Sequence, residues 1–404
     1  MYLAAHPALA GLRDWHADLT AIRRELHRHP ELGFEEHFTS ELVVRQLERC
    51  GVDEIHRGLG KTGVVGVIRG ARHRDGQGSA RTVGLRADMD ALPLNEENAF
   101  EHRSTAAGRM HACGHDGHTA MLLGAARWLA RHRRFDGTVH LIFQPGEEGY
   151  AGARAMIEDG LFERFPCDTV YAMHNWPGLP TGTIAVRPGA TMAAADTVQI
   201  TIEGKGGHGA HAYLAVDPVV VAAHVVTAVQ TIVSRNVGPL DSAVISLCSI
   251  QAGNPMATSV IPREAVITGT VRSFRRETQE LIEARLTQLA EQVAAGLGAR
   301  ARVEYTRMYP ATINTPAEAE FGAQVAEELV GEANTIRNLD PSMGAEDFAF
   351  MLEQRPGAYF RIGQGGADSG CFLHNPRYDF NDAILPIGAS YWARLVETSL
   401  AAAG

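Results

Sequence analysis

The sequence predicts an α/β protein, in which a mostly parallel, helix-covered sheet is interrupted by a smaller α+β domain. Three observations support this prediction. Strand-like and helical patterns alternate through residues 1–189 and again through 306–404. The segment 190–305 instead follows the order β-α-β-β-α-β. With 404 residues, of which 45% are apolar and 21% charged, the chain can form two globular domains. We therefore expect a discontinuous main domain, 1–189 with 306–404, into which the smaller domain 190–305 is inserted.

The main domain begins with a helical region and continues with alternating strands and helices. Apolar residues recur at helical spacing through 12–50. The predicted elements that follow are strands at 62–70, 80–88, 140–143 and 168–176, helices at 117–133 and 151–163, and a late strand at 357–363. This alternation predicts parallel strands joined through helices.

The inserted domain has its own signals. A strand that begins near 197 ends in glycines, and a helix follows at 217–235, with Asp217 placed to cap it and Pro218 in its first turn. Further strands at 243–253, 264–274 and 301–309 surround a long helix at 277–297.

Composition excludes several classes of protein. The formal net charge of −10 argues against nucleic-acid binding, which requires clustered Lys and Arg. The longest apolar stretch, 215–233, is broken by Asp217, Pro218 and His224, so we expect no membrane span. The first residues lack the pattern of a signal peptide. Five scattered cysteines without a CxxC pair (Cys50, Cys113, Cys167, Cys248 and Cys371) indicate reduced thiols and a cytoplasmic location.

The segment MHACGHDGHTA is the densest group of metal-binding residue types. It contains His111, Cys113, His115, Asp116 and His118, just before a predicted helix. Ligands of α/β proteins bind in loops at the ends of strands, where this segment is expected to lie. Thiolate and imidazole groups in such a loop favour a metal over a purely structural role.

Glu147 and Glu148 follow a predicted buried strand, in the sequence FQPGEEG. Two adjacent carboxylates there repel each other, and a divalent cation would remove that repulsion. One carboxylate can bind the cation while its neighbour acts as general base on a water. His174 and His374 follow other strands, and with Cys113, His115 and Glu148 they supply enough donors for two bridged metal ions.

Three other candidate sites are not supported by the sequence. GLGKTG (58–63) lacks the first glycine of a phosphate loop, because Ile55 occupies that position. The glycines of GKGGHG (204–209) match a dinucleotide-binding pattern, but no acidic residue occurs between 218 and 240 to bind a ribose. A Cys113–His nucleophile pair would leave the paired glutamates without a role.

With these residues located, the chain resembles the aminoacylase/carboxypeptidase family of co-catalytic metallopeptidases. It is most similar to the branch of hippurate hydrolases, N-acyl-amino acid hydrolases and indoleacetyl-amino acid hydrolases. The resemblance runs nearly end to end, through RRELHRHPELGFEE, LRADMDALP, MHACGHDGHTAML, FQPGEEG, GKGGHGAH, GTVRSF, GAEDFAFML and FLHNPRYDFND.

The resemblance implies two divalent metal ions per subunit, with Zn²⁺ or Mn²⁺ expected and Co²⁺ or Ni²⁺ compatible with the donors. The implied ligands are Cys113, His115, Glu148, His174 and His374, with Cys113 as the bridge. It also implies that Glu147 is the general base. Relatives outside this branch have His-x-Asp where this chain has Arg86-Ala87-Asp88, which leaves Asp88 an orienting role.

The resemblance implies that the inserted domain, 190–305, is a lid or dimerisation domain, and it assigns substrate contacts to this domain. His208 would reach the scissile carbonyl oxygen in the partner subunit's site, and Arg272 would bind the substrate carboxylate. Two positions depart from the family pattern. Ser259 replaces the usual Asn before VIP, where the family residue helps to hold substrate, and Ala212-Tyr213 replaces Pro-His. These departures leave the preferred acyl group and amino acid open.

We therefore expect a homodimeric or larger cytoplasmic amidohydrolase that releases a carboxylic acid and an amino acid from N-acyl-amino acids. Two alternatives remain open at this point. One is a dipeptidase or an amino-acid-pathway deacylase with the same metals. The other is a ligand-binding dimer that binds metal without catalysis, against which the intact Glu147 argues.

Overall fold

The computed structural model describes residues 7–74, 78–366 and 372–402, and Cys371 lies outside these ranges. The chain divides into two compact units. The first contains residues up to Thr191 together with Ile313–Asp340 and the segment from Asp347 onward, and the second contains Met192–Thr312 and Pro341–Glu346. The chain passes from one unit to the other within the short strands β7 (Gly189–Met192) and β14 (Thr312–Asn314).

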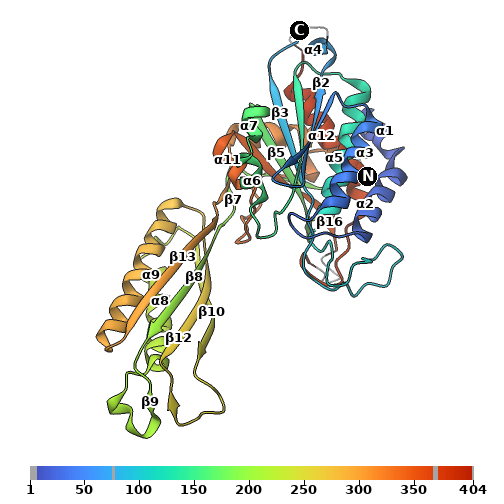
Figure 1. Ribbon diagram of the computed structural model, residues 1–404. Coiled ribbons are helices and arrows are strands. Elements are labelled where there is room, and N and C mark those ends of the chain that lie inside the picture. The colour runs from blue at the N-terminus through green and yellow to red at the C-terminus, as the bar shows by residue number, and fades with distance from the viewer. Residues whose placement is uncertain (1–6, 75–77, 367–371, 403–404) are drawn as a thin grey trace. The chain divides into compact units, whose positions relative to one another are not determined.

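The first unit is built on an eight-stranded sheet in the order β1-β2-β4-β3-β5-β16-β6-β15 (Figure 1). Its strands are β1 (Glu54–Leu59), β2 (Gly63–Arg69), β3 (Thr82–Asp88), β4 (Thr138–Gln144), β5 (Thr169–Pro177), β6 (Ile184–Ala185), β15 (Thr335–Ile336) and β16 (Gly357–Gly365). The four central strands β4, β3, β5 and β16 are parallel to one another. The sheet is therefore mostly parallel, as the sequence predicts, and its carboxyl ends meet at one edge.

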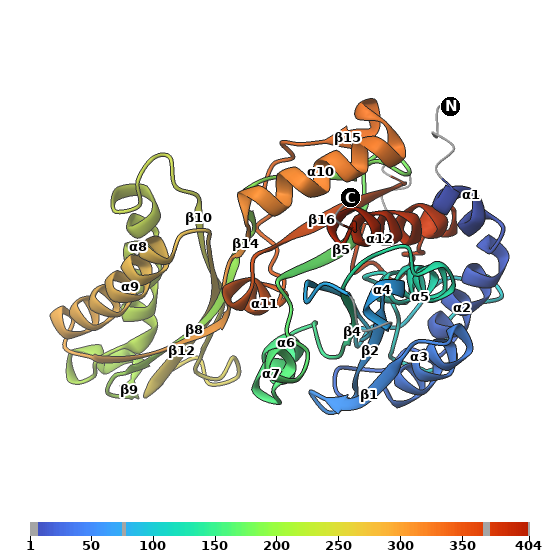
Figure 2. The same ribbon diagram turned by 90° about the horizontal axis from the view of Figure 1, so that it is seen from above.

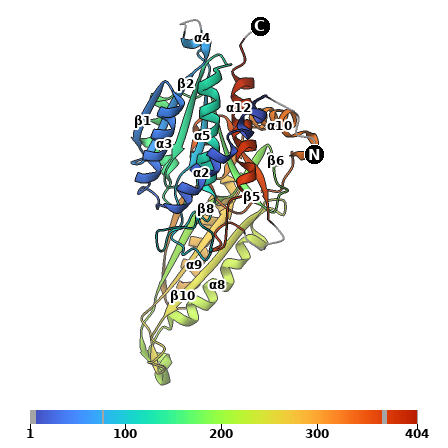
Figure 3. The same cartoon turned by 90° about the vertical axis from the view of Figure 1, so that its right-hand side faces the viewer.

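Helices cover this sheet and complete the core. They are α1 (Pro7–Arg13), α2 (His16–Arg28), α3 (His37–Cys50), α4 (Ala71–Arg74), α5 (His115–His132), α6 (Gly152–Glu158), α7 (Leu161–Arg164), α10 (Pro316–Val330), α11 (Ala349–Gln354) and α12 (Leu385–Ser399). Helix α5 is buried along most of its length and packs against α2, α3 and α12 (Figure 3). This burial fixes the start of α5, where His115 lies.

Two details of this unit differ from the sequence prediction. The segment 151–163, predicted as one helix, forms α6 and α7. Gly160 between them has a φ of +84°, a left-handed conformation that ends a helix and that glycine adopts readily. Strand β1 was not predicted, because its half-exposed residues lack a clear apolar alternation.

The second unit has a four-stranded antiparallel sheet in the order β10-β12-β8-β13. Its main elements are β8 (Ala194–Glu203), α8 (Pro218–Arg235), β10 (Ala243–Ala252), β12 (Glu264–Ser273), α9 (Arg276–Gly296) and β13 (Arg300–Tyr309). Helices α8 and α9 lie side by side on one face of this sheet (Figure 2). A short strand pair, β9 (Gly207–His208) with β11 (Val260–Ile261), completes the unit.

Helix α8 is long and apolar enough to span a membrane by length and composition alone. Its buried stripe, which includes Val221, Val225, Val229 and Ile232, belongs to the aliphatic core of the second unit. The core helix of a globular domain passes the same test, so α8 is explained by its packing.

Candidate metal centre

Cys113 and His115 flank a glycine at the start of α5. Gly114 has a φ of +95°, and a Cβ there would lie 2.3 Å from Asn175 Oδ1 and 2.6 Å from the Tyr378 hydroxyl. Only glycine therefore allows the turn that places Cys113 and His115 on either side of it. Both side chains are buried.

Cys113, His115 and His174 form a first set of donors. The ligand atoms of the three side chains lie within 4.8 Å of one another, and the Cys113 Sγ is 3.3 Å from His174 Nε2. The Nδ1 of His174 donates to the carbonyl of Asn175 at 2.6 Å, which leaves Nε2 with a lone pair for a cation.

Cys113, Glu148 and His374 form a second set within the same distance limit. His374 Nε2 lies 3.1 Å from Glu148 Oε1. His374 adopts a φ of +63°, which is uncommon for a residue with a side chain, and its backbone N–H donates to the carbonyl of Ala112 at 2.8 Å. This bond links the C-terminal loop to the segment that carries Cys113. It keeps His374 close to the thiol that both donor sets contain.

Neighbouring carboxylates raise the pKa values of both Cys113 and His115. Burial raises the pKa of the Cys113 thiol well above its ordinary range, and Glu148 and Glu147 raise it further. Burial lowers the pKa of His115, but Asp88 and Asp90 outweigh that effect and raise it to about 10. Divalent cations at this position would reverse these preferences, because they favour a thiolate and a neutral imidazole.

His115 provides a direct test of whether a metal fits. Its Nδ1 is 3.2 Å from Asp90 Oδ1, whereas its buried Nε2 has no hydrogen-bond partner among the described residues. A buried polar atom without a partner is costly, and a cation held with Cys113 or Glu148 would satisfy it. The sulfur, nitrogen and oxygen donors together suit transition-metal ions.

Glu147 lies beside this cluster and is buried. It groups with His115 and Glu148 within 4.8 Å, and one of its oxygens, Oε1, lies 3.4 Å from the backbone nitrogen of Asp347, which donates to it. Neither of the donor sets that share Cys113 includes Glu147.

Asp88 is connected to neighbours of the cluster. Its Oδ1 is 2.6 Å from His118 Nδ1, and its Oδ2 accepts from Arg86 at 2.7 Å. His118 also groups with Asp88 and His115, but its Nε2 is already engaged by Asn175. The carboxylate that hydrogen-bonds His115 is Asp90, which sequence reasoning missed although it lies two residues after Asp88.

His111 takes no part in the donor sets. It is buried, and burial lowers its pKa to about 4. Of the residues in MHACGHDGHTA, Asp116 is likewise committed elsewhere, to an ion pair with Arg23 and a bond to His27. Within this segment, Cys113 belongs to both donor sets and His115 belongs to the first.

His208, Ser259 and Arg272 all belong to the second unit. His208 in β9 is exposed and pairs with Val260 of β11, and the carbonyl of Ser259 accepts from the Gly209 N–H at 2.7 Å. Arg272 lies on β12 and is half-buried, without an ion pair to any described residue. Burial lowers the pKa of its guanidinium, while Asp196 raises it.

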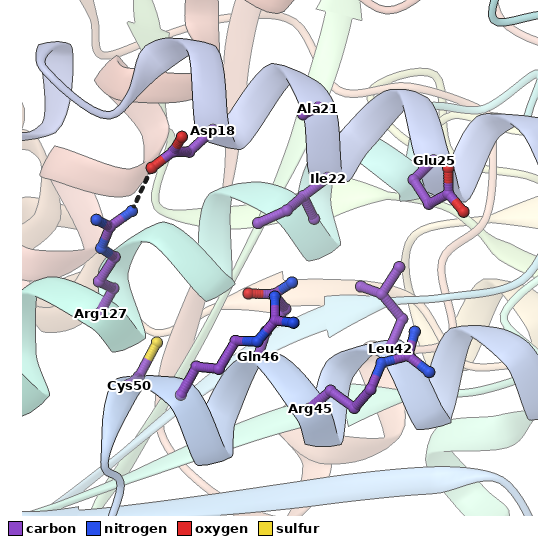
Figure 4. Close-up of a pocket in the computed structure, with 10 residues that line it drawn as sticks. Asp18, Ala21, Ile22, Glu25, Leu42, Arg45, Gln46, Cys50 and Arg127 are labelled. Atoms are coloured by element: carbon purple, nitrogen blue, oxygen red, sulfur yellow. Dashed lines mark hydrogen bonds and ion pairs between the residues drawn. The ribbon is translucent and has the colours of Figure 1, made fainter.

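A groove elsewhere on the first unit contains none of these residues. It lies between α2 and α3, with a volume of about 660 Å³, and is lined by Asp18, Ala21, Ile22, Glu25, Leu42, Arg45, Gln46, Arg49, Cys50 and Arg127 (Figure 4). Arg127 is paired with Asp18 at 2.8 Å. Burial raises the pKa of Cys50 to about 11, so the one thiol in the groove is not activated.

Comparison with known proteins places the chain among metallopeptidases. Residues 84–398 match peptidase family M20/M25/M40. The chain is 41% identical to a hippurate hydrolase of Campylobacter jejuni, over 95% of this chain and 96% of that protein. It is 36% identical to an N-acetylcysteine deacetylase of Bacillus subtilis, over 95% and 97%. A dinuclear metal-binding peptidase of the M20 family from Bacillus subtilis has a similar structure, with a TM-score of 0.82, 34% identity, and coverage of 96% of this chain and 99% of that one.

Proposed function

The chain belongs to peptidase family M20/M25/M40 and is a metal-dependent amidohydrolase of N-acyl-amino acids, and we propose that its substrates are hippurate-like. Such substrates join an aromatic or aliphatic acyl group to an amino acid with a free carboxylate. One observation carries the chemical part of the proposal: two three-donor sets share Cys113, and Glu147 lies next to them. The hippurate hydrolase of Campylobacter jejuni supports the substrate class.

We assign each residue of the cluster a role. Two divalent cations would be held by Cys113, which both donor sets contain, together with His115, His174, Glu148 and His374. The cations would polarise the scissile carbonyl and acidify the attacking water. Glu147 would accept a proton from that water and later deliver it to the leaving amine. Asp88 would orient its neighbours by holding His118.

The second unit would supply the substrate contacts. Arg272 offers a half-buried guanidinium, a group that suits bidentate recognition of the carboxylate of the amino acid. His208 would stabilise the oxyanion in the site of a partner subunit, and the exposed position of its side chain is compatible with that role. Ser259, adjacent to the β9–β11 pair, would contribute to substrate binding.

We further propose zinc or manganese as the native metal, a homodimer as the minimum assembly and the cytoplasm as the location. The thiol and imidazole donors favour zinc, and the carboxylate also accepts manganese. The second unit has an unpaired sheet edge at β10 and exposed apolar side chains, including Val219, Val220 and Ile250, which support an interface. The four described cysteines are free, which suits a reducing compartment.

A substrate panel with metal reconstitution tests the proposal. Hippurate, N-acetyl-amino acids and aliphatic N-acyl-amino acids are compared with free dipeptides, after removal of metal and addition of Zn²⁺, Mn²⁺, Co²⁺ or Ni²⁺. We expect the highest kcat/KM for N-acyl-amino acids and elemental analysis close to two metal ions per subunit. Hippuramide, in which the carboxylate is amidated, should be a poor substrate because it cannot pair with Arg272. Faster turnover of dipeptides would reassign the enzyme as a dipeptidase.

A further inference from the structure

Glu147 lies on a loop that is held at both ends. The loop, residues 145–151, connects Gln144, the last residue of β4, to α6. A catalytic carboxylate on a loop must be fixed by its surroundings to keep a productive geometry. The contacts of this loop therefore determine where Glu147 points.

Asp347 contacts both ends and the middle of this loop. Its Oδ1 accepts from the side-chain amide of Gln144 at 2.8 Å, and its Oδ2 accepts from the backbone N–H of Ala153 in the first turn of α6 at 2.8 Å. Its own backbone N–H donates to Glu147 Oε1 at 3.4 Å. Asp347 is fully buried, so water does not compete for these bonds.

Arg86 compensates the buried charge of Asp347. Its guanidinium donates to Asp347 Oδ1 at 3.0 Å, to Asp88 Oδ2 at 2.7 Å, and through Nε to Gln144 Oε1 at 2.8 Å. It is 1% exposed. A buried cation that meets two buried carboxylates offsets the cost of burying their charge.

We propose that Asp347, held by Arg86, is a positioning residue that fixes Glu147 against the metal centre. It acts by clamping the ends of the loop and by donating its backbone N–H to the carboxylate of the base. This inference rests on the proposed function, since it assigns a task to Asp347 in the same reaction.

Asp347→Asn tests the clamp with little change in shape. The NH₂ group of an asparagine would face one of the donors from which Asp347 now accepts a hydrogen bond. At least one of these bonds would therefore be lost. We expect kcat to fall about 10–100-fold, the range typical for partners that orient catalytic groups. KM should change less than about threefold, and the metal content should stay near two per subunit. Backbone amides of residues 146–152 should exchange hydrogen faster than in the parent enzyme.

Asp136→Asn is the matched control. Asp136 is also a buried aspartate, and it accepts from the backbone N–H of Ser79. It lies just before β4, at the opposite end of that strand from Gln144. It should leave kcat and the exchange of residues 146–152 unchanged. Gln144→Met provides a second route if the first variant folds poorly, because it removes one bond to Asp347 and one to Arg86.

The outcomes separate this inference from the proposed function. If Asp347→Asn matches Asp136→Asn in kcat, or if its lost activity simply follows lost metal, the clamp is refuted. A parent enzyme that hydrolyses no N-acyl-amino acid, or a Glu147→Gln variant that stays fully active, would instead refute the proposed function. Loss of kcat with metal retained and faster loop exchange would support the clamp.

Discussion

In the unit that carries Cys113 and Glu147, ionisable side chains are buried in connected groups, whereas the core of the other unit is almost entirely aliphatic. The first unit buries Arg23, Arg86, Asp88, Asp116 and Asp347 among others, each with a charged partner. Among the described charged residues of the second unit, Asp196 and Glu346 are the buried ones. Both units meet the same requirement for a close-packed interior, but the first unit buries many more charged side chains than the second.

This difference indicates what each unit contributes. Burying a charge is costly unless it is paired and hydrogen-bonded, so a connected set of buried charges is retained where it is needed to hold chemical groups. The proposed contributions of the second unit, from His208 and Arg272, come instead from side chains on its surface and sheet. Its aliphatic core supports these side chains, and burial lowers the pKa of Arg272.

The largest expected effect is on the residue that carries the chemistry. Glu147→Gln preserves the shape of the side chain but removes the proton acceptor, so kcat should fall about 10²–10⁴-fold. Metal content should remain near two per subunit, because the proposed ligands are unchanged. Elemental analysis and steady-state kinetics on the same preparation measure both quantities. Unchanged kcat would mean that another group acts as the base.

The next prediction concerns the free energy of unfolding. It compares the loss of a buried charge in the first unit with the truncation of a buried aliphatic residue in the second. Arg23 is fully buried and lies 2.9 Å from Asp116 Oδ2, and it also pairs with Asp379. Arg23→Met would remove the guanidinium from Asp116, the neighbour of His115, and leave its bond to His27, so it should lower the free energy of unfolding by about 3–5 kcal/mol.

Ile200→Ala is the partner variant in the second unit. Ile200 is completely buried in its aliphatic core, and its truncation should cost about 2–5 kcal/mol. Denaturant unfolding measures both losses, and metal content distinguishes them. We expect Arg23→Met to lose metal more readily and Ile200→Ala to retain it. Equal metal retention would show that the buried charges of the first unit do not support the centre.

The metal-donor residues of the first unit could be predicted from the sequence, because they occur in short motifs. HACGH and FQPGEEG place Cys113, His115, Glu147 and Glu148 at strand ends, and the alternation of elements predicts a parallel sheet that brings such ends together. The prediction of the mostly parallel sheet is confirmed by the structure and by similarity to the M20 peptidase structure.

The supporting contacts could not be predicted in this way. Arg86 and Asp347 are 261 residues apart, and no spacing rule connects residues that only the tertiary fold brings together. Asp90 is close to Asp88 in sequence, yet Asp90 hydrogen-bonds His115 whereas Asp88 hydrogen-bonds His118. Pairings of this kind depend on backbone geometry that residue types do not encode locally.

The smallest effect tests whether buried ionisable residues in the first unit always serve the site. His140 is buried on β4, with its Nδ1 3.5 Å from Cys167 Sγ, and it belongs to none of the donor sets. Burial lowers its pKa to about 4, and Arg69 adds to the effect. The unfolded chain, with an ordinary histidine pKa of about 6.5, therefore binds a proton that the folded protein does not bind between these values.

The sign of the resulting pH dependence follows from that difference. The stability from a neutral His140 is fully present above pH 6.5 and is lost as the pH falls to about 4, with a total near 3 kcal/mol. His140→Asn, which cannot be protonated, should remove this part of the acid sensitivity. Unfolding free energies of both proteins at pH 7 and pH 4.5 measure it, and kcat at pH 7 should be the same in both. A large loss of kcat would mean that even this distant histidine supports the reaction, and burial of charge in the first unit would then be tied to catalysis throughout.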